Sequence, residues 1–323
     1  MTSASTSQTR CPLCGGAARR WLTVPGDWRR PELDVRYELF WCPSCVHGFL
    51  DPMPSLEDAI AAHDLDEYFT HHDVQDGSGR GTLARRVERK LRTHLAWRFD
   101  NGGSTPDNFA SALQGCTRVL EIGCGKGELG AFLKERGHEY TGIEIDATAR
   151  SIAQERGLEV VEGTAESVPP ELEGRTFDAI IAAHVLEHVT DVHAAMQTVK
   201  SLAKARARII FEVPNNVAVG GKAQGACWYW LDAPRHVHFF SGPSLRRLLE
   251  GAGFRVDWFR YTGLMRQFED EWIAAEQHIH DVLTPRGWRG PRASRLRTWR
   301  LLAETIRAPH EERYDSVMVR ASA

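Results

Sequence analysis

Four cysteines near the start of the chain have the spacing of a metal site. They form two Cys-x-x-Cys pairs, Cys11 with Cys14 and Cys42 with Cys45. Each pair can fold as a knuckle whose backbone N–H groups turn toward the sulfurs, and two knuckles complete a tetrahedral four-sulfur site for zinc. Because such a site has no open coordination position, we expect a structural Zn²⁺ that folds a segment too short to have its own core. A redox role fits less well, since it needs one Cys-x-x-Cys at a helix start.

A glycine-rich turn indicates a cofactor site. Gly123, Gly125 and Gly127 follow an apolar run at 118–122, and a helical pattern begins after them. Glycine allows a cofactor to approach the backbone more closely than any Cβ would permit. A second apolar run ends at Glu144, about 20 residues after the glycines, where a neighbouring strand places a carboxylate beside a ribose. The pattern predicts a nucleotide-type cofactor, and a nicotinamide would fit this geometry as well.

Histidines near two further apolar runs supply groups for proton transfer. His184, Glu187 and His188 follow a fourth run with spacing i, i+3 and i+4, which predicts one shared face of a first helical turn. His236 and His238 follow a fifth run, and the carboxyl ends of parallel strands meet at one edge of a sheet. A hydroxyl nucleophile benefits from a base or a Lewis acid, since its pKa lies far above working pH. We predict His184, His236 and His238 as catalytic residues; packing in the core is the alternative.

Together these stretches resemble the class I S-adenosylmethionine (SAM) dependent methyltransferases over residues 115–263. Five motifs support the resemblance: Glu-x-Gly-x-Gly-x-Gly from Glu121, the strand-end acid Glu144, Gly-Thr-Ala-Glu ending at Glu166, Phe-Asp-Ala-Ile from Phe177, and His-Val-Leu-Glu-His from His184. The resemblance implies an α/β fold with a doubly wound, seven-stranded Rossmann-like sheet, and SAM as the cofactor. The residues that it assigns to the cofactor are Glu121, Gly123, Gly125, Gly127, Glu144, Ile145, Ala165, Glu166 and Ala183.

The resemblance also raises a second metal. In the ubiquinone-pathway O-methyltransferases and the small-RNA 2′-O-methyltransferases that this chain resembles, a Glu-x-x-Glu-His turn and a later His hold a divalent metal. Here His184 replaces the first Glu, and the later His is either His236 or His238. A divalent metal at His184, Glu187 and His188 is one interpretation. The other follows many relatives, in which a similar turn packs without a metal.

The rest of the chain is arranged around this core. We expect a zinc ribbon-like module at 1–55, a helical lid and linker at 56–114, the SAM-binding core at 115–263, a helical insertion at 264–312 and the last strand at 313–323. A lid before the first strand is implied by the resemblance. In it, an amphipathic helix is predicted from Thr82 with apolar residues every four positions. These residues are Leu83, Val87, Leu91 and Leu95. A linker rich in Gly, Ser, Asn and Pro is predicted to follow at 101–116.

The arrangement resembles bacterial methyltransferases of saccharide and secondary-metabolite pathways. O-methylation of a hydroxylated small molecule is therefore the leading hypothesis. The predicted acceptor contacts are Tyr68, Asn215, Trp228, Trp230 and Arg235. Alternatives are C- or N-methylation of a small metabolite or nucleotide sugar, methylation of RNA, and a non-catalytic zinc-ribbon scaffold.

Charge and composition weigh against some partners. The chain of 323 residues has a net charge of −3, so no global field favours nucleic acid. No apolar run is long enough to span a bilayer, and the first residues lack the apolar core of a signal peptide, so we expect a cytoplasmic enzyme. Seven arginines lie between Arg286 and Arg307. They suit either an anionic ligand or the surface of a homo-oligomer.

Overall fold

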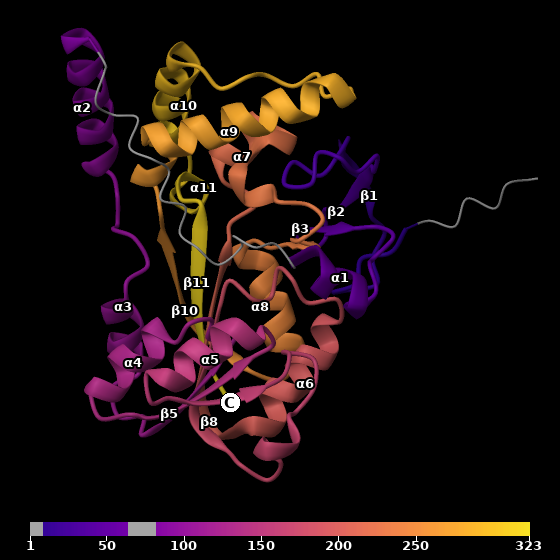
Figure 1. Cartoon of the computed structure of the whole chain (residues 1–323), viewed down its shortest axis with the longest axis vertical. Helices are drawn as coiled ribbons and strands as arrows, with labels where there is room; N and C mark the ends of the chain where they lie inside the picture. The colour runs from indigo at the N-terminus through magenta and orange to yellow at the C-terminus, as the bar shows by residue number, and fades with distance from the viewer. Residues whose placement is uncertain (1–8, 64–81) are drawn as a thin grey trace, which may run out of the picture.

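A seven-stranded sheet forms the centre of the computed structural model, which describes residues 9–63 and 82–323 (Figure 1). The strand order is β10-β11-β8-β7-β4-β5-β6. Its strands are β4 (Arg118–Ile122), β5 (Glu139–Glu144), β6 (Glu159–Glu162), β7 (Phe177–Ala183), β8 (Ala203–Pro214), β10 (Arg255–Thr262) and β11 (Ser316–Ser322). The five strands β6, β5, β4, β7 and β8, in this order across the sheet, pair in parallel. Strand β11 lies between β8 and β10 and is antiparallel to both. The predicted seven-stranded sheet, with its last strand delayed by an insertion, is confirmed.

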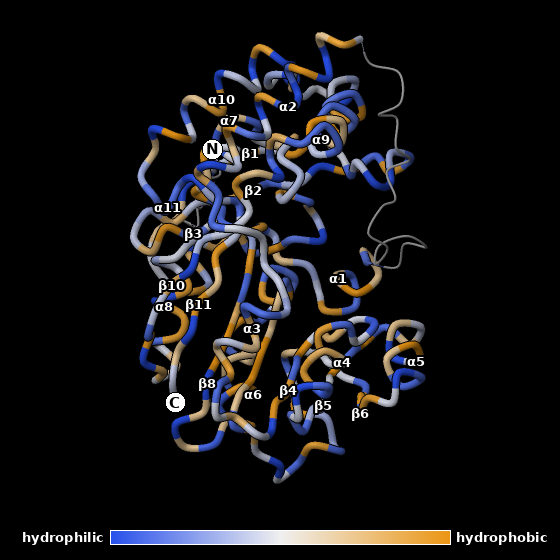
Figure 2. The backbone as a smooth tube through the Cα atoms, turned by 90° about the vertical axis from the view of Figure 1, so that its left-hand side faces the viewer, coloured by the Kyte–Doolittle hydropathy of each residue, from blue (hydrophilic) through white to orange (hydrophobic). Residues whose placement is uncertain are grey.

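Both faces of the sheet are covered by helices. Val119 points into one apolar cluster with α3, α4 and α5, whereas Leu120 and Ile122 point into another with α6 and α8. This alternation follows from the two-residue period of a strand, and Figure 2 shows apolar colour along the central strands. The helices are α1 (Leu56–His63), α2 (Leu83–Trp97), α3 (Pro106–Ala112), α4 (Glu128–Glu135), α5 (Ala147–Glu155), α6 (Val192–Leu202), α7 (Val219–Gln224), α8 (Gly242–Gly251), α9 (Asp270–Leu283), α10 (Arg295–Arg307) and α11 (His310–Arg313).

The N-terminal module has a small antiparallel sheet of its own. Its order is β1-β2-β3-β9, with β1 (Arg19–Val24), β2 (Tyr37–Cys42), β3 (His47–Leu50) and β9 (His238–Phe239). Strand β9 comes from the loop after β8, so the catalytic core supplies the fourth strand of the module. Cys11, Cys42 and Cys45 also lie in the same apolar cluster as Leu120 of the central sheet. The module is therefore built onto the core.

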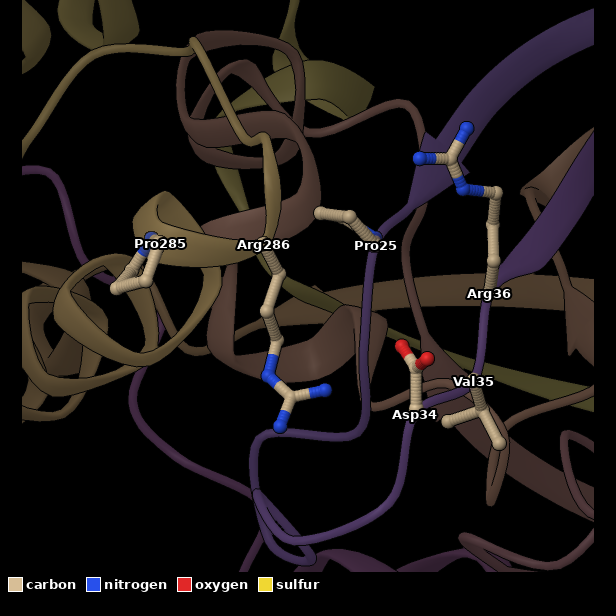
Figure 3. Close-up of a pocket in the computed structure, with 6 residues that line it drawn as sticks. All are labelled: Pro25, Asp34, Val35, Arg36, Pro285 and Arg286. Carbon is tan, nitrogen blue, oxygen red and sulfur yellow. The ribbon is translucent and has the colours of Figure 1, made fainter.

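The insertion between β10 and β11 joins the core to the module. It consists mainly of α9 and α10, which lie at the top of Figure 1. Arg286 at its turn donates hydrogen bonds to the backbone oxygens of Pro31 and Leu33. Figure 3 shows the pocket at this seam, where Arg286 lies beside the loop that carries Pro25 and Asp34. Five short 3₁₀ turns complete the described structure: η2 (Pro170–Leu172), η3 (Gly225–Cys227), η4 (Tyr229–Leu231), η5 (Met265–Phe268) and η6 (Thr284–Arg286).

Helix α2 is present where it is predicted, but the prediction of its buried face is wrong. Three of the predicted inward residues are exposed at 78%, 57% and 52%: Leu83, Val87 and Leu91. Arg92 is buried instead. Its guanidinium donates to the Phe268 carbonyl and pairs with Glu88 and Asp270. The side of α2 that carries Arg92 contacts η5. The polar partners of Arg92 therefore set the orientation of the helix, and the spacing of its apolar residues does not.

The predicted linker at 101–116 is also partly wrong. It contains α3, which buries Phe109 and Ala112 in the cluster that covers one face of the sheet. Pro106 occupies the first turn of this helix, a position that proline favours because its missing N–H has no helical partner there. This part of the predicted linker is therefore a helix that packs on the sheet.

Among the described helices, none has the length and apolar composition that crossing a bilayer requires.

Candidate active site

The glycine turn after β4 has the shape of a cofactor cradle. Gly123, Gly125 and Gly127 all have positive φ, between 54° and 76°. A Cβ on Gly127 would lie 2.4 Å from Leu158, so this glycine is needed for packing. A Cβ on Gly125 would meet no atom of the described chain within 4 Å. Gly125 is thus the point where the backbone lies open to a ligand.

Glu144 lies at the end of β5 and holds this turn. One carboxylate oxygen accepts from the backbone N–H of Gly125 at 2.8 Å, and the other accepts from Asp146 at 2.9 Å. Burial raises the pKa of the Glu144 carboxyl. Ile145, the next residue, has 41% of its surface exposed. A carboxylate with an exposed apolar side chain beside it suits a ribose and an adenine.

The other predicted cofactor residues support the cradle from within. Glu121 is buried and accepts a hydrogen bond from the Tyr140 hydroxyl, and burial raises its pKa to about 8. Glu166 accepts from the backbone N–H groups of Thr190 at 2.6 Å and Asp191 at 3.2 Å. These two carboxyl groups therefore already have protein partners. Ala165 is buried, and Ala183 is half-buried at the end of β7.

The stretch after β7 is a turn, so the predicted helical face of His184, Glu187 and His188 is wrong. Helix α6 begins only at Val192, after its N-cap Asp191. His184 has φ of 55°, and its N–H donates to the Glu212 carbonyl at 2.8 Å. The left-handed conformation of His184 turns the chain directly after β7 and interrupts regular secondary structure there.

The turn brings His184 and Glu187 together. Nδ1 of His184 lies 3.2 Å from Oε1 of Glu187. Burial lowers the pKa of His184, but Glu187 and Glu212 raise it more, with a net rise above its usual range. The ring also stacks on Trp230, with centroids 5.0 Å apart and an interplanar angle of 11°. His184 is thus held in one orientation by Glu187 and Trp230.

Glu187, His188 and His236 form a compact group of ligand-type atoms. One such atom from each residue lies within 4.8 Å of the other two. Nδ1 of His188 donates to the Arg235 carbonyl at 3.0 Å, and Nδ1 of His236 donates to the Trp230 carbonyl at 2.7 Å. These bonds fix the tautomer and leave the lone pair on Nε2 of each ring. Among the described residues, no hydrogen-bond donor reaches Oε2 of Glu187, although this oxygen is buried.

Both histidines of this group are neutral near pH 7. Burial lowers the pKa of His188 to about 3 and that of His236 to about 4. A neutral imidazole and a carboxylate are the forms that bind a divalent cation. His63 of α1 joins from the lid side, because its Nε2 lies 2.9 Å from Nδ1 of His188. Sequence reasoning missed His63 as a site residue, and its place at the end of a predicted lid helix was the one available signal.

The structure separates His236 from His238. His238 is buried, and its Nδ1 lies 3.0 Å from Nε2 of His47 in the N-terminal module. Its ring therefore packs between the module and the core. The prediction that His238 takes part in catalysis does not fit this position.

Three of the predicted acceptor contacts are at most 1% exposed: Asn215, Trp228 and Arg235. Asn215 donates to the Glu311 and Tyr314 carbonyls, and Arg235 pairs with two aspartates. Direct contact with an acceptor does not fit such burial. Trp230 is half-buried against His184, and its contact with an acceptor stays a prediction. Tyr68 lies outside the described residues.

The four cysteines of the N-terminal module converge as predicted. Their sulfurs lie within 4.8 Å of one another, with Cys11 to Cys45 at 3.5 Å and Cys14 to Cys42 at 3.6 Å. A tetrahedral zinc with Zn–S bonds of about 2.3 Å places its sulfurs about 3.8 Å apart. The residue after each second cysteine has positive φ, 66° at Gly15 and 56° at Val46, so both knuckles have the same turn. A hydrogen bond from Cys45 lowers the pKa of Cys11.

Comparisons with known proteins agree with this architecture. A protein-family model described as a methyltransferase domain matches residues 80–257. The ubiquinone biosynthesis O-methyltransferase of Alkalilimnicola ehrlichii is 33% identical over 108 residues, which cover 30% of this chain and 42% of that protein. Its namesake from Stutzerimonas stutzeri is 32% identical over 131 residues, which cover 38% and 56%. The chain spans about half the length of the curated relatives that it matches.

Solved methyltransferase structures show a more distant likeness. A SAM-dependent methyltransferase from Archaeoglobus fulgidus has a TM-score of 0.46 and 19% identity, and the match covers 75% of this chain and all of that one. The family model, in contrast, covers more than half of the 323 residues. The chain therefore belongs to the methyltransferase-domain family.

Proposed function

We propose that this enzyme transfers the methyl group of SAM to a hydroxyl oxygen of a small molecule, and that Glu187, His188 and His236 hold a divalent cation for this reaction. One observation carries the proposal: a buried carboxylate oxygen of Glu187 has no hydrogen-bond donor among the described residues, and it lies beside two neutral histidines whose Nδ1 atoms donate to carbonyls. A buried carboxylate oxygen without a partner is costly unless a ligand completes it. The printed name of the curated relatives, an O-methyltransferase, adds support.

A cation bound there would act as a Lewis acid that lowers the pKa of an acceptor hydroxyl. Three protein ligands leave coordination positions for the acceptor's oxygen atoms, as in other catalytic metal sites. His184 lies next to this group, and its side chain is 32% exposed. With Nδ1–H donated to Glu187, its Nε2 can take the proton of the acceptor hydroxyl. Trp230 would hold an apolar face of the acceptor beside the ring of His184.

The cofactor's place follows from the turn after β4. We assign the ribose hydroxyls to Glu144, the adenine to Ile145 and Ala165, and the methionine end to the backbone at Gly123 and Gly125. Methyl transfer is an in-line displacement that needs alignment above all. The glycine turn and the turn after β7 lie at the carboxyl ends of neighbouring strands, since β4 and β7 pair in parallel. Sulfonium and acceptor would therefore meet at this edge of the sheet.

We assign a structural Zn²⁺ to the four cysteines. A site closed by four sulfurs offers no position to a substrate, so its role is to fold the module. The fit of the sulfur separations to a tetrahedron and the matched knuckle turns support this assignment.

The product of the reaction tests the proposal directly. The enzyme is incubated with SAM labelled with ¹³C in the methyl group, with Mn²⁺ or Mg²⁺, and with a panel of catechol, hydroxybenzoate and sugar acceptors. We expect a product whose methyl carbon has the ¹³C shift of an O-methyl group, and loss of at least 99% of turnover in Glu187→Gln. His94→Ala is the matched control, because His94 is exposed on α2.

Other outcomes would contradict the proposal. A methyl carbon bonded to nitrogen or carbon would replace O-methylation with one of the alternative reactions. Full turnover in Glu187→Gln, or full turnover in EDTA with the cysteine zinc retained, would remove the divalent cation from the mechanism.

A further inference from the structure

The segment that carries His236 is held from two sides. On one side it meets the turn after β7, where the N–H groups of Val237 and His238 donate to the Glu187 carbonyl at 2.8 and 3.1 Å. On the other side it pairs with the N-terminal module through β3 and β9. The N-terminal module therefore contacts the same short stretch of chain that positions the proposed metal ligands.

A buried ion pair adds a more specific connection. Asp27, in the loop after β1, accepts from both terminal nitrogens of Arg235, at 2.7 and 2.8 Å. Both residues are at most 1% exposed. Asp232 accepts from Nε of the same guanidinium at 3.0 Å and from Nη2 at 2.7 Å, so each nitrogen of the Arg235 guanidinium donates to a carboxylate. A bidentate pair of this kind fixes orientation as well as distance.

The backbone of Arg235 acts directly on the proposed metal site. Its carbonyl accepts the Nδ1–H of His188 at 3.0 Å, the bond that fixes the tautomer of this ligand. The N–H of His236 donates to the Asp232 carbonyl, so both proposed histidine ligands depend on residues of this ionic group. A chain of contacts thus runs from Asp27 through the side chain and the carbonyl of Arg235 to His188. In metal sites, partners of this kind orient the ligand and set its affinity.

We infer that Asp27 of the N-terminal module is a positioning residue for the divalent-metal centre, acting through Arg235 on His188 and His236. This inference rests on the proposed function of that centre. It also gives the N-terminal module a role in the reaction: the loop between β1 and β2 supplies a second carboxylate for the Arg235 guanidinium, beside that of Asp232 from the core.

The test compares Asp27→Asn with Asp34→Asn. The two substitutions are chemically identical and lie in the same loop, but Asp34 is exposed. We expect Asp27→Asn to weaken Mn²⁺ binding by 10- to 100-fold. Electron paramagnetic resonance of free Mn²⁺ measures this binding. Affinity for S-adenosylhomocysteine and zinc content should stay within twofold of the parent. Asp34→Asn should match the parent in all three.

A second readout needs no metal. Long-range ¹H–¹⁵N spectra of the histidine rings report the tautomer of each imidazole, and the parent should show His188 with its proton on Nδ1. We expect this signal to shift or broaden in Asp27→Asn and to stay in Asp34→Asn. If the parent binds no Mn²⁺, the metal proposal fails, and the His188 signal alone still decides the role of Asp27.

Two results would overturn the inference. One is a folded Asp27→Asn protein, judged by S-adenosylhomocysteine binding, with the His188 signal of the parent. The other is parental Mn²⁺ affinity in that variant. If Asp27→Asn does not fold, the same measurements on Asp27→Glu decide, because Glu keeps the charge but displaces the carboxylate. Parental values there would reject a positioning role, and a shifted His188 signal would support it.

Discussion

Two groups of side chains in this protein are suited to bind a metal, and they differ in what they leave open. The four cysteines come from two matched knuckles and close a tetrahedron. Glu187, His188 and His236 come from two loops of the core and provide only three ligands. A closed set of sulfurs serves folding, whereas an open set of nitrogen and oxygen ligands serves chemistry. The two proposed sites thus differ in ligand type and in ligand number.

Among these predictions, the largest effect is expected from removing a proposed cysteine ligand of the zinc site. Cys14→Ser is expected to lose about one equivalent of zinc and to unfold the module, since structural zinc contributes roughly 10–16 kcal/mol in zinc-finger peptides. Zinc content and the fluorescence of the Trp21–Trp41 pair, with ring centroids 5.2 Å apart, measure the loss. Because the module also holds the loop of His236, Mn²⁺ binding should fall in the same variant.

Cys116→Ser is the control for that experiment. Cys116 is half-buried outside the module, and its thiol lies 3.7 Å from the Asp178 carbonyl. Its replacement should leave zinc content unchanged. A Cys14→Ser protein that keeps a full equivalent of zinc and a folded module would show that the four-sulfur site is not what folds this segment.

Next in size is the difference between His236 and His238. His236→Ala removes a proposed ligand, so Mn²⁺ affinity and turnover should fall by 10²-fold or more, while S-adenosylhomocysteine affinity stays within twofold. His238→Ala instead removes a buried ring that contacts His47, and it should lower the thermal midpoint with little change in Mn²⁺ affinity. Equal effects of both variants on Mn²⁺ affinity would contradict the assignment of His236 as a metal ligand and His238 as a packing residue.

The cofactor turn provides a third, smaller effect. Glu144→Ala should weaken SAM binding by 10- to 100-fold, the loss expected for hydrogen bonds to a charged group. Glu166→Ala should weaken it less, because this carboxylate holds the turn after β7 at Thr190 and Asp191, whereas Glu144 holds the open glycine turn at Gly125. Calorimetry with SAM measures both. If Glu166→Ala proved the more damaging variant, the ribose assignment of Glu144 would be wrong.

How far the sequence predicts these regions depends on how local each one is. The four cysteines and the glycine turn are readable because their ligands or their glycines are neighbours in the chain, and the acid on β5 follows at a known separation. The delayed last strand, β11, is readable from its apolar run. Local patterns in the sequence are therefore enough to predict the sheet and the cysteine cluster.

The open centre could not be predicted in the same way. A spacing of i, i+3 and i+4 predicts a helix, but the left-handed His184 makes a turn that directs His188 toward His236. The choice between His236 and His238 depends on β9, a two-residue strand whose pairing is set by the distant module. Burial of Asn215, Trp228 and Arg235 is likewise a tertiary result. Long-range packing determines the positions and the burial of these side chains, and local sequence patterns carry no information on it.

His184 offers the smallest and most discriminating test, because the two parts of its proposed role can be separated. Asn keeps an N–H donor near the position of Nδ1 and tolerates the positive φ of this residue. His184→Asn should therefore keep the hydrogen bond to Glu187 and hold Mn²⁺ affinity within about threefold of the parent, whereas His184→Ala should lower it about tenfold. Turnover should fall in both, since neither side chain can accept a proton. If His184→Asn retained turnover, the base would lie elsewhere, and His184 would serve only to orient Glu187.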